Sequence, residues 1–217
     1  MSYVRKKSGE TNNLNNDVES SKISWSSFRK LMQEDQAGMA LIAHQNQADF
    51  RIVAIKTRGV GSEQYNENSR LTSYKNLVNL QSFFEHEGSM NFVYESCSVS
   101  LADIQASPYG LLQEYEIAAV CKELLEGLGY ISELLRVGHT LRCETILVTE
   151  DGYPKIANIG DIMLDSHNLE CLESSRLLGY LLKYLLEPVS VLDANHKLEL
   201  SSHNVWSSDA EDFLLQT

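Results

Sequence analysis

In the first half of the chain, apolar residues form short runs that polar residues separate. The runs at residues 40–44 and 50–56 predict strands, and the second contains the β-branched residues that favour a sheet. Two more strands are predicted at residues 83–84 and 91–94, joined by a short Glu-Gly turn. This half of the chain is therefore expected to form a small β-sheet.

In the second half, apolar residues recur at every third or fourth position, which is the period of a helix that buries one face. The longest such segment covers residues 117–135, and Gly138 is expected to end it. A second apolar helix is predicted over residues 169–186, before Pro188, and a last one over residues 209–215. This half is therefore expected to be mainly helical.

Two shorter patterns complete the outline. Four apolar residues share one face of a helix and predict a helix before the first strand: Trp25, Phe28, Leu31 and Met32. Two short strands are predicted at residues 146–148 and 155–157, around an Asp-Gly turn. Strands followed by helices predict an α+β fold with two lobes, a small antiparallel sheet and a mainly helical part. Residues 1–22 are polar and are expected to form a disordered tail, because they cannot bury enough apolar surface to offset the entropy of ordering.

The charge of the chain narrows the classes of partner. It carries 18 basic and 30 acidic residues, a net charge of −12. Nucleic acids and anionic membranes bind to concentrated positive charge, so neither is expected as a partner. The four cysteines contain no Cys-x-x-Cys pair, which argues against a zinc site or a redox dithiol. No secretory signal and no membrane-spanning run is recognised, so we expect a cytoplasmic or nuclear protein that is neither secreted nor membrane-spanning.

A series of short motifs occurs in the order found in protein kinases. The four motifs are Val53-Ala54-Ile55-Lys56, Phe92-Val93-Tyr94-Glu95, the stretch from Gly138 to Leu147, and Asn158-Ile159-Gly160. The first resembles the kinase strand whose lysine contacts the nucleotide phosphates, and the second resembles the strand that leads to the hinge. The third and fourth resemble the kinase catalytic loop and the Asp-Phe-Gly motif.

The resemblance implies a bilobal protein-kinase-like fold over residues 23–217. Residues 23–95 would form the sheet lobe and residues 96–217 the helical lobe. The helical lobe is expected to be shortened, because only residues 161–168 separate the Asn-Ile-Gly motif from the next apolar helix and no Ala-Pro-Glu motif occurs. Within the superfamily, the chain looks similar to short kinase-like proteins of filamentous fungi that have an eroded catalytic loop.

The departures from the kinase pattern concern the residues that carry the chemistry. The alignment puts Thr140 at the catalytic-base aspartate, Thr145 at the Mg²⁺-binding asparagine and Asn158 at the Mg²⁺-binding aspartate. A threonine hydroxyl does not accept a proton at neutral pH, and Mg²⁺ prefers carboxylate oxygens. The sequence therefore predicts no catalytic residue, no metal site and no Mg²⁺ at these positions.

The positions that would contact ATP are better preserved than the catalytic ones. The resemblance assigns Lys56 to the phosphates, and Glu95 and Cys97 to the hinge. The partner carboxylate of Lys56 is expected near residue 65, where Glu67 is preferred over Glu63. The glycine-rich loop is not preserved, because residues 36–41 contain one glycine where the kinase pattern has three. ATP binding is thus left open by the sequence.

Three functional interpretations follow from these residues. The favoured one is a catalytically inactive kinase-like domain, a pseudokinase that acts as a scaffold or regulator by binding a protein partner. The second is a weak ATP-dependent protein kinase in which Asp161 or Glu144 replaces the missing acids. The third is a switch that binds ATP without metal or turnover, through Lys56 and the hinge.

Overall fold

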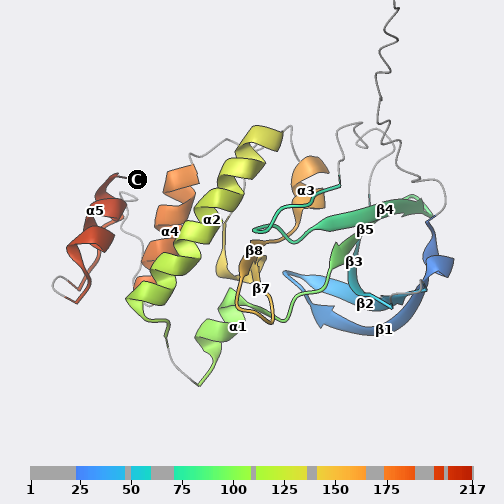
Figure 1. Ribbon diagram of the computed structural model, residues 1–217, viewed down its shortest axis with the longest axis horizontal. Coiled ribbons are helices and arrows are strands. Elements are labelled where there is room, and N and C mark those ends of the chain that lie inside the picture. The colour runs from blue at the N-terminus through green and yellow to red at the C-terminus, as the bar shows by residue number, and fades with distance from the viewer. Residues whose placement is uncertain are drawn as a thin grey trace, which may run out of the picture.

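The computed structural model describes residues 23–46, 50–59, 71–108, 111–135, 141–164, 174–188, 198–202 and 205–216. The predicted tail, Gly138 as a helix terminator, and residues Glu67 and Thr140 lie outside these ranges. A five-stranded antiparallel sheet and a group of helices lie side by side, with a small three-stranded sheet between them (Figure 1). The α+β class predicted from the sequence is confirmed.

The larger sheet has the strand order β1-β2-β3-β5-β4. Its strands are β1 (Phe28–Asp35), β2 (Met39–Gln45), β3 (Ile52–Gly59), β4 (Leu80–His86) and β5 (Ser89–Glu95). The hairpin between β4 and β5 turns at Glu87 and Gly88, both of which have positive φ values of 50° and 71°. Two successive left-handed residues match the twist of the flanking strands, which is why this turn closes a tight hairpin.

The predicted helix over residues 25–32 is wrong. Only Trp25–Ser27 form a 3₁₀ helix, η2, and β1 follows directly. β1 pairs with β2 along its whole length, so the backbone hydrogen bonds come from a neighbouring strand instead of a helix. Trp25 and Phe28 instead pack on Phe84 of β4, with ring centroids 5.3 and 5.9 Å away. The two residues are apolar because they contact the sheet. This tertiary contact decides the local structure in place of the helical spacing of the apolar residues.

The smaller sheet and the helices form the rest of the molecule. Strands β6 (Val99–Ser100), β7 (Ile146–Val148) and β8 (Pro154–Ile156) are antiparallel. The helices are α1 (Leu101–Ala106), α2 (Glu114–Leu135), α3 (Ile159–Leu164), α4 (Ser174–Leu186) and α5 (Ser208–Gln216). The predicted long helix, the last helix and the 146–148 and 155–157 strands are thus confirmed to within a few residues. Of the predicted helix over 169–186, residues 174–186 are helical and 169–173 lie outside the described ranges.

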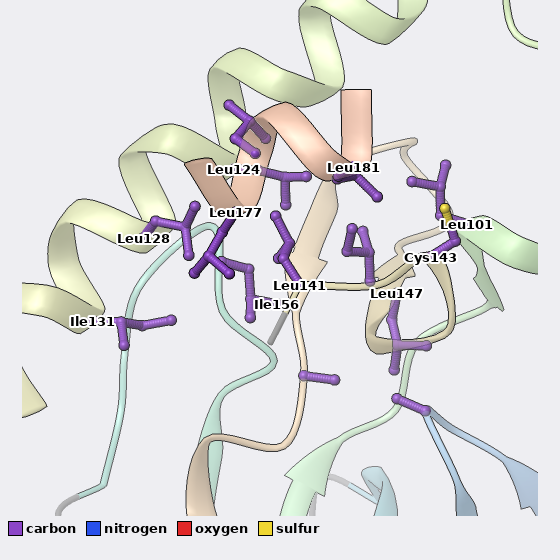
Figure 2. Packing of buried hydrophobic residues seen from close by; sticks show 14 of the residues in the cluster. Leu101, Leu124, Leu128, Ile131, Leu141, Cys143, Leu147, Ile156, Leu177 and Leu181 are labelled. Carbon is purple, nitrogen blue, oxygen red and sulfur yellow. The ribbon is translucent and has the colours of Figure 1, made fainter. Parts of the chain in front are cut away.

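One hydrophobic core joins the two parts. Leucines of α2 and α4 face each other above Ile156 of β8 and Leu147 of β7 (Figure 2). The same cluster of buried residues continues into Phe92 and Tyr94 of β5. A backbone link reinforces it, because the Val78 N–H donates to the Ile156 carbonyl at 2.9 Å. The two parts are therefore packed together, and the junction between them holds the candidate site.

The antiparallel sheet fits the sheet lobe that the resemblance implies. The shortening of the helical part and the boundaries at residues 23, 95 and 96 stay predictions. No helix among the described residues has both the length and the apolar character needed to cross a membrane.

Candidate functional site

The candidate site is a narrow cleft at the junction of the two sheets. It is lined by residues from the β1–β2 turn, β3, β5, β7 and the segments before β4 and after β8: Gln36, Ala54, Lys56, Val78, Tyr94, Glu95, Leu147, Ala157 and Asn158. The resemblance places the nucleotide here, between Lys56 and the hinge. The free volume between these residues is about 10 Å³, which is room for about one water molecule.

Lys56 projects from β3 toward the residue at the Asp-Phe-Gly position. Its ammonium donates to Asn158 Oδ1 at 2.5 Å and to the Ala37 carbonyl at 2.7 Å. Asn158 Nδ2 donates to the same Ala37 carbonyl at 3.0 Å. Burial lowers the pKa of Lys56 to about 8, and the charges of Asp161 and Asp35 only partly oppose that shift. The partners of Lys56 in the cleft are therefore a neutral amide and a backbone carbonyl.

The turn between β1 and β2 replaces the glycine-rich loop. Ala37 has a φ of 61° and Gly38 a φ of 104°, so two successive residues are left-handed. The Gly38 N–H donates to Asp35 Oδ1 at 2.7 Å, and the Gln36 N–H donates to the Gly38 carbonyl at 2.9 Å. In a phosphate-binding loop such N–H groups face the phosphates. Here they are used within the turn, which points the Ala37 carbonyl at Lys56.

Gln36 reaches from the same turn to the hinge, the segment of residues 95–98 that links β5 to β6. Its Nε2 donates to the Cys97 carbonyl at 3.0 Å, and its Oε1 accepts from the Cys97 N–H at 3.0 Å. The side chain is buried, with 2% of its surface exposed. Both hydrogen-bonding groups of the Cys97 backbone are thus taken by one carboxamide.

The two hinge residues predicted from the sequence have different roles. Glu95 Oε1 accepts from Lys155 Nζ at 2.7 Å and from the Asn79 N–H at 2.8 Å. Its carboxylate therefore ties the hinge to β8. Burial raises the pKa of the Cys97 thiol to about 11, so the thiol is neutral and only its backbone offers polar groups. Glu95 lines the cleft, and Cys97 contacts Gln36, which also lines it. The use of either residue by a ligand stays a prediction.

Thr145 directly precedes β7, and its hydroxyl is hydrogen-bonded to the nearby backbone. Its hydroxyl donates to the Arg142 carbonyl at 2.9 Å and accepts from the Arg142 N–H at 3.1 Å. These bonds close the 3₁₀ turn η3 (Cys143–Thr145) that precedes β7. Thr145 is buried and the neighbouring Glu144 is exposed. Neither Thr145 nor Glu144 is among the described residues that line the cleft.

Asp161, the other acid considered as a replacement, lies in the first turn of α3 and pairs with Arg58 of β3. Its Oδ1 accepts from Arg58 Nη1 at 3.2 Å, and both side chains are partly exposed, at 37% and 36%. The carboxylate acts on Lys56 through its charge, without a direct contact among those described. Within the described ranges, no three His, Cys, Asp or Glu residues are placed to hold a metal ion. Thr140 and Glu67, the remaining site predictions, lie outside those ranges.

The backbone that follows Asn158 is fixed against the sheet. The Gly160 N–H donates to the Tyr94 hydroxyl at 2.9 Å. A Cβ atom at Gly160 would lie 2.6 Å from both Phe92 Cδ1 and the Tyr94 hydroxyl, so only glycine fits. Burial strongly raises the pKa of Tyr94, which keeps its hydroxyl neutral. This contact explains why a glycine stands here.

Sequence reasoning missed three contacts in and near the cleft, which are made by the Gln36 side chain, the Ala37 carbonyl and Arg58. For Gln36, the available signal was a carboxamide side chain in the segment that corresponds to the glycine-rich loop of kinases. The hydrogen bonds of Ala37 come from its carbonyl, which no side-chain pattern reveals. Arg58 pairs with Asp161, which is 103 positions away in the sequence, and no local sequence pattern indicates such a pair.

Comparisons with known proteins point to the protein kinases. The chain is 30% identical over 118 residues to Serine/threonine-protein kinase 1 of Arabidopsis thaliana. This match spans 50% of the chain and 14% of that relative. It is 30% identical over 119 residues to Serine/threonine-protein kinase Tao of Drosophila melanogaster, and 34% identical over 80 residues to Serine/threonine-protein kinase cst-1 of Caenorhabditis elegans. The matches span 50% and 36% of this chain, and 12% and 16% of those relatives. No protein-family model matches the chain. The matches support a protein-kinase-like relationship.

Proposed function

We propose that the chain is a kinase-like domain that does not transfer phosphate and acts by binding a protein partner. One observation carries this proposal: the Lys56 ammonium is held by the neutral carboxamide of Asn158 at 2.5 Å. In a kinase, an aspartate at this position binds Mg²⁺, which neutralises charge on the transferred phosphoryl group. A carboxamide brings no negative charge to the cleft and holds Mg²⁺ weakly.

The other acids near the cleft do not supply what Asn158 lacks. Asp161 is paired with Arg58, and Glu144 is directed to solvent. The Thr145 hydroxyl is used in the η3 turn, so it is not free to bind a metal ion. Phosphoryl transfer depends on positioning and on electrostatic stabilisation of the developing charge. With these groups already engaged, transfer at a useful rate is not expected.

A weak ATP-dependent kinase is the second candidate, because the charge of Asp161 reaches Lys56 and opposes the lowering of its pKa. For that activity, Asp161 would have to leave Arg58 and bind Mg²⁺. The third interpretation, a metal-independent ATP switch, needs Lys56 and the hinge to become free together. Both alternatives therefore require the cleft to rearrange.

Melting temperatures with millimolar ATP separate the three interpretations. A ligand at 100 times its Kd adds about 2.7 kcal/mol of stability, which is roughly 5–10 °C for a chain of this size. The proposal predicts no shift with or without Mg²⁺. A Mg²⁺-dependent shift that Lys56→Ala removes would favour the kinase, and a shift that persists in EDTA would favour the switch.

The partner-binding part of the proposal has a candidate surface on the helices. A groove of about 640 Å³ lies between α2, α4 and α5. Its apolar and aromatic lining comes from eight residues: Tyr115, Ala118, Cys121, Leu125, Leu178, Leu182, Ala210 and Phe213. Its lining also contains two acidic residues, Glu114 and Asp209, and one basic residue, Lys122. Lys122 is the single basic residue of α2 and α5, which together carry eight acidic residues. By charge complementarity, we propose a basic amphipathic helix of a partner protein as the occupant.

A designed peptide of leucine and lysine with helical amphipathic spacing tests this surface, and a scrambled peptide of the same composition is its control. Leu125→Asp, in the groove, should weaken peptide binding at least tenfold. Leu31→Asp, which adds the same charge on the exposed face of β1, should leave binding unchanged. Equal affinities for both peptides or both variants, or dimerisation of the chain through this groove in sedimentation experiments, would contradict the proposed occupant.

A further inference from the structure

We propose that Gln36 is an internal occupant of the hinge and decides which ligands the cleft accepts. A flat heteroaromatic ligand of the adenine type would bind to the Cys97 backbone only after displacing the Gln36 side chain. This inference rests on the kinase-like assignment of the hinge. It goes beyond the absence of phosphoryl transfer, because it concerns access to the cleft and not the chemistry inside it.

The geometry of Gln36 provides the first argument. A carboxamide is planar and carries a donor and an acceptor side by side. Its two hydrogen bonds to Cys97, both 3.0 Å long, satisfy the hinge N–H and the hinge carbonyl together. Adenine offers the same arrangement, a ring nitrogen that accepts beside an amino group that donates. Gln36 and adenine therefore compete for the same backbone groups.

The neighbouring residue blocks the other end of the cleft. The Ala37 carbonyl accepts from both Lys56 and Asn158, at 2.7 and 3.0 Å. Because Gln36 and Ala37 are consecutive, one turn occupies both the hinge and the lysine that would contact phosphates. Four hydrogen bonds must break together before a nucleotide can enter. The remaining volume of about 10 Å³ is far too small for an adenine ring.

The turn lies at the edge of the sheet, where few buried contacts hold it. It connects β1 to β2, and β1 is the edge strand of the described sheet. Seven of the eight residues of β1 are exposed, so few buried contacts hold this strand in addition to its pairing. A left-handed alanine is unfavourable compared with glycine, so the closed turn depends on its hydrogen bonds to Lys56, Asn158 and Cys97. Removing the Gln36 bonds should therefore open the cleft.

Adenosine titration in EDTA tests the inference without any metal or phosphate. The full chain should show no saturable binding of adenosine at millimolar concentration, measured by calorimetry. Gln36→Ala should bind adenosine at least tenfold more tightly than the unaltered chain. Gln33→Ala, which removes an exposed carboxamide from β1 just before the turn, is the matched control and should behave like the unaltered chain.

Hydrogen exchange provides a readout that does not depend on the stability of the variant. In the unaltered chain, the Cys97 amide and the Gln36 side-chain amide should both be protected in NMR spectra. Rapid exchange of the Gln36 amide protons at the rate of an exposed glutamine would overturn the inference. So would equal adenosine affinity in Gln36→Ala and in the unaltered chain.

The outcomes separate this inference from the proposed function. If Gln36→Ala binds adenosine but transfers no phosphate from Mg²⁺-ATP, both statements hold. If the unaltered chain binds adenosine as tightly as Gln36→Ala and transfers no phosphate, the gating role of Gln36 fails and the proposed function stands. If the unaltered chain transfers phosphate in a reaction that needs Lys56, the proposed function fails whatever the adenosine affinities are.

Discussion

The Lys56 ammonium lies 2.5 Å from the carboxamide oxygen of Asn158, and both groups converge on the Ala37 carbonyl. This arrangement satisfies the lysine without a carboxylate in contact with it among the described residues. Because the cleft is closed around it, the lysine is desolvated and its pKa is lowered to about 8. The charged form of Lys56 is therefore less favourable in the folded chain than in water.

The lowered pKa of Lys56 predicts how the free energy of unfolding depends on pH. Between pH 8 and 10.5 the unfolded state holds a proton on this lysine that the folded state has lost, so stability rises with pH across this window. Relative to Lys56→Met, the unaltered chain should gain about 1–3 kcal/mol between pH 8 and 10.5, measured by urea unfolding. No relative gain is expected below pH 7.

Lys75→Met is the control for that comparison. Hydrogen bonds to Glu126 and Glu123 raise the pKa of the exposed Lys75 to about 12. The stabilisation that the charged Lys75 gives to the folded state is therefore fully present below pH 10.5, and it is lost only as the pH approaches 12. The difference between this variant and the unaltered chain should be flat from pH 8 to 10. Parallel curves for Lys56→Met and the unaltered chain would contradict the account of the cleft.

Gly160 is predicted to tolerate no side chain. The Cβ of Gly160→Ala would lie 2.6 Å from the Phe92 ring and from the Tyr94 hydroxyl. The clash should destabilise the chain by about 2–4 kcal/mol in denaturant unfolding. Gly129→Ala on α2 is the control, since nothing lies within 4 Å of its Cβ, and it should stabilise the chain by about 0.5–1 kcal/mol. Similar effects at both positions would show that α3 does not pack against β5 as described.

The ion pair between Glu95 and Lys155 is predicted to be structural. The side chains of Lys155 and Glu95 are 11% and 27% exposed and lie 2.7 Å apart. Glu95→Gln leaves a largely buried ammonium without its counter-charge, which should cost about 2 kcal/mol of unfolding free energy. Glu126→Gln, in the more exposed pair with Lys75, should change stability by less than about 0.5 kcal/mol. If the two losses are equal, Glu95 does not brace the hinge.

The β4–β5 hairpin offers a stabilising substitution. Glu87 is exposed and left-handed, with a φ of 50°, and Gly88 follows it. Asn-Gly is the preferred sequence for such a turn, so Glu87→Asn should stabilise the chain by about 0.5–1 kcal/mol. Glu85→Asn, which removes the same charge from the neighbouring strand, should be neutral or destabilising. The two melting temperatures, measured side by side, decide between these outcomes.

The fold was predictable where local pattern and tertiary structure agree. The long helix α2 and the hairpin at Glu87-Gly88 follow from periodicity and turn residues in the sequence. β1 was not predictable in this way, because seven of its eight residues are exposed and its structure depends on pairing with β2. Trp25 and Phe28 pack against the sheet, and their spacing of three residues is also the spacing of a helical face. The pattern alone therefore did not distinguish the two structures.

The sequence predicted only those residues of the candidate site that belong to the kinase-like motifs. The motifs located Lys56 and Asn158, and the structure brings them into contact across 102 positions of sequence. The pairing of Gln36 with Cys97 spans 61 positions and involves backbone groups that every residue possesses. Such a contact depends on the shape of one turn, which residue types alone do not specify.

Transfer of the γ-phosphate of radiolabelled ATP tests the central claim most directly. The chain, Lys56→Met and an active kinase would be incubated with Mg²⁺ or Mn²⁺ and a general protein acceptor. We predict that the chain incorporates no more label than Lys56→Met, because Asn158 and Thr145 provide no anionic site for the metal. Incorporation that requires the divalent cation, exceeds that of Lys56→Met and disappears in Asp161→Ala would contradict the claim.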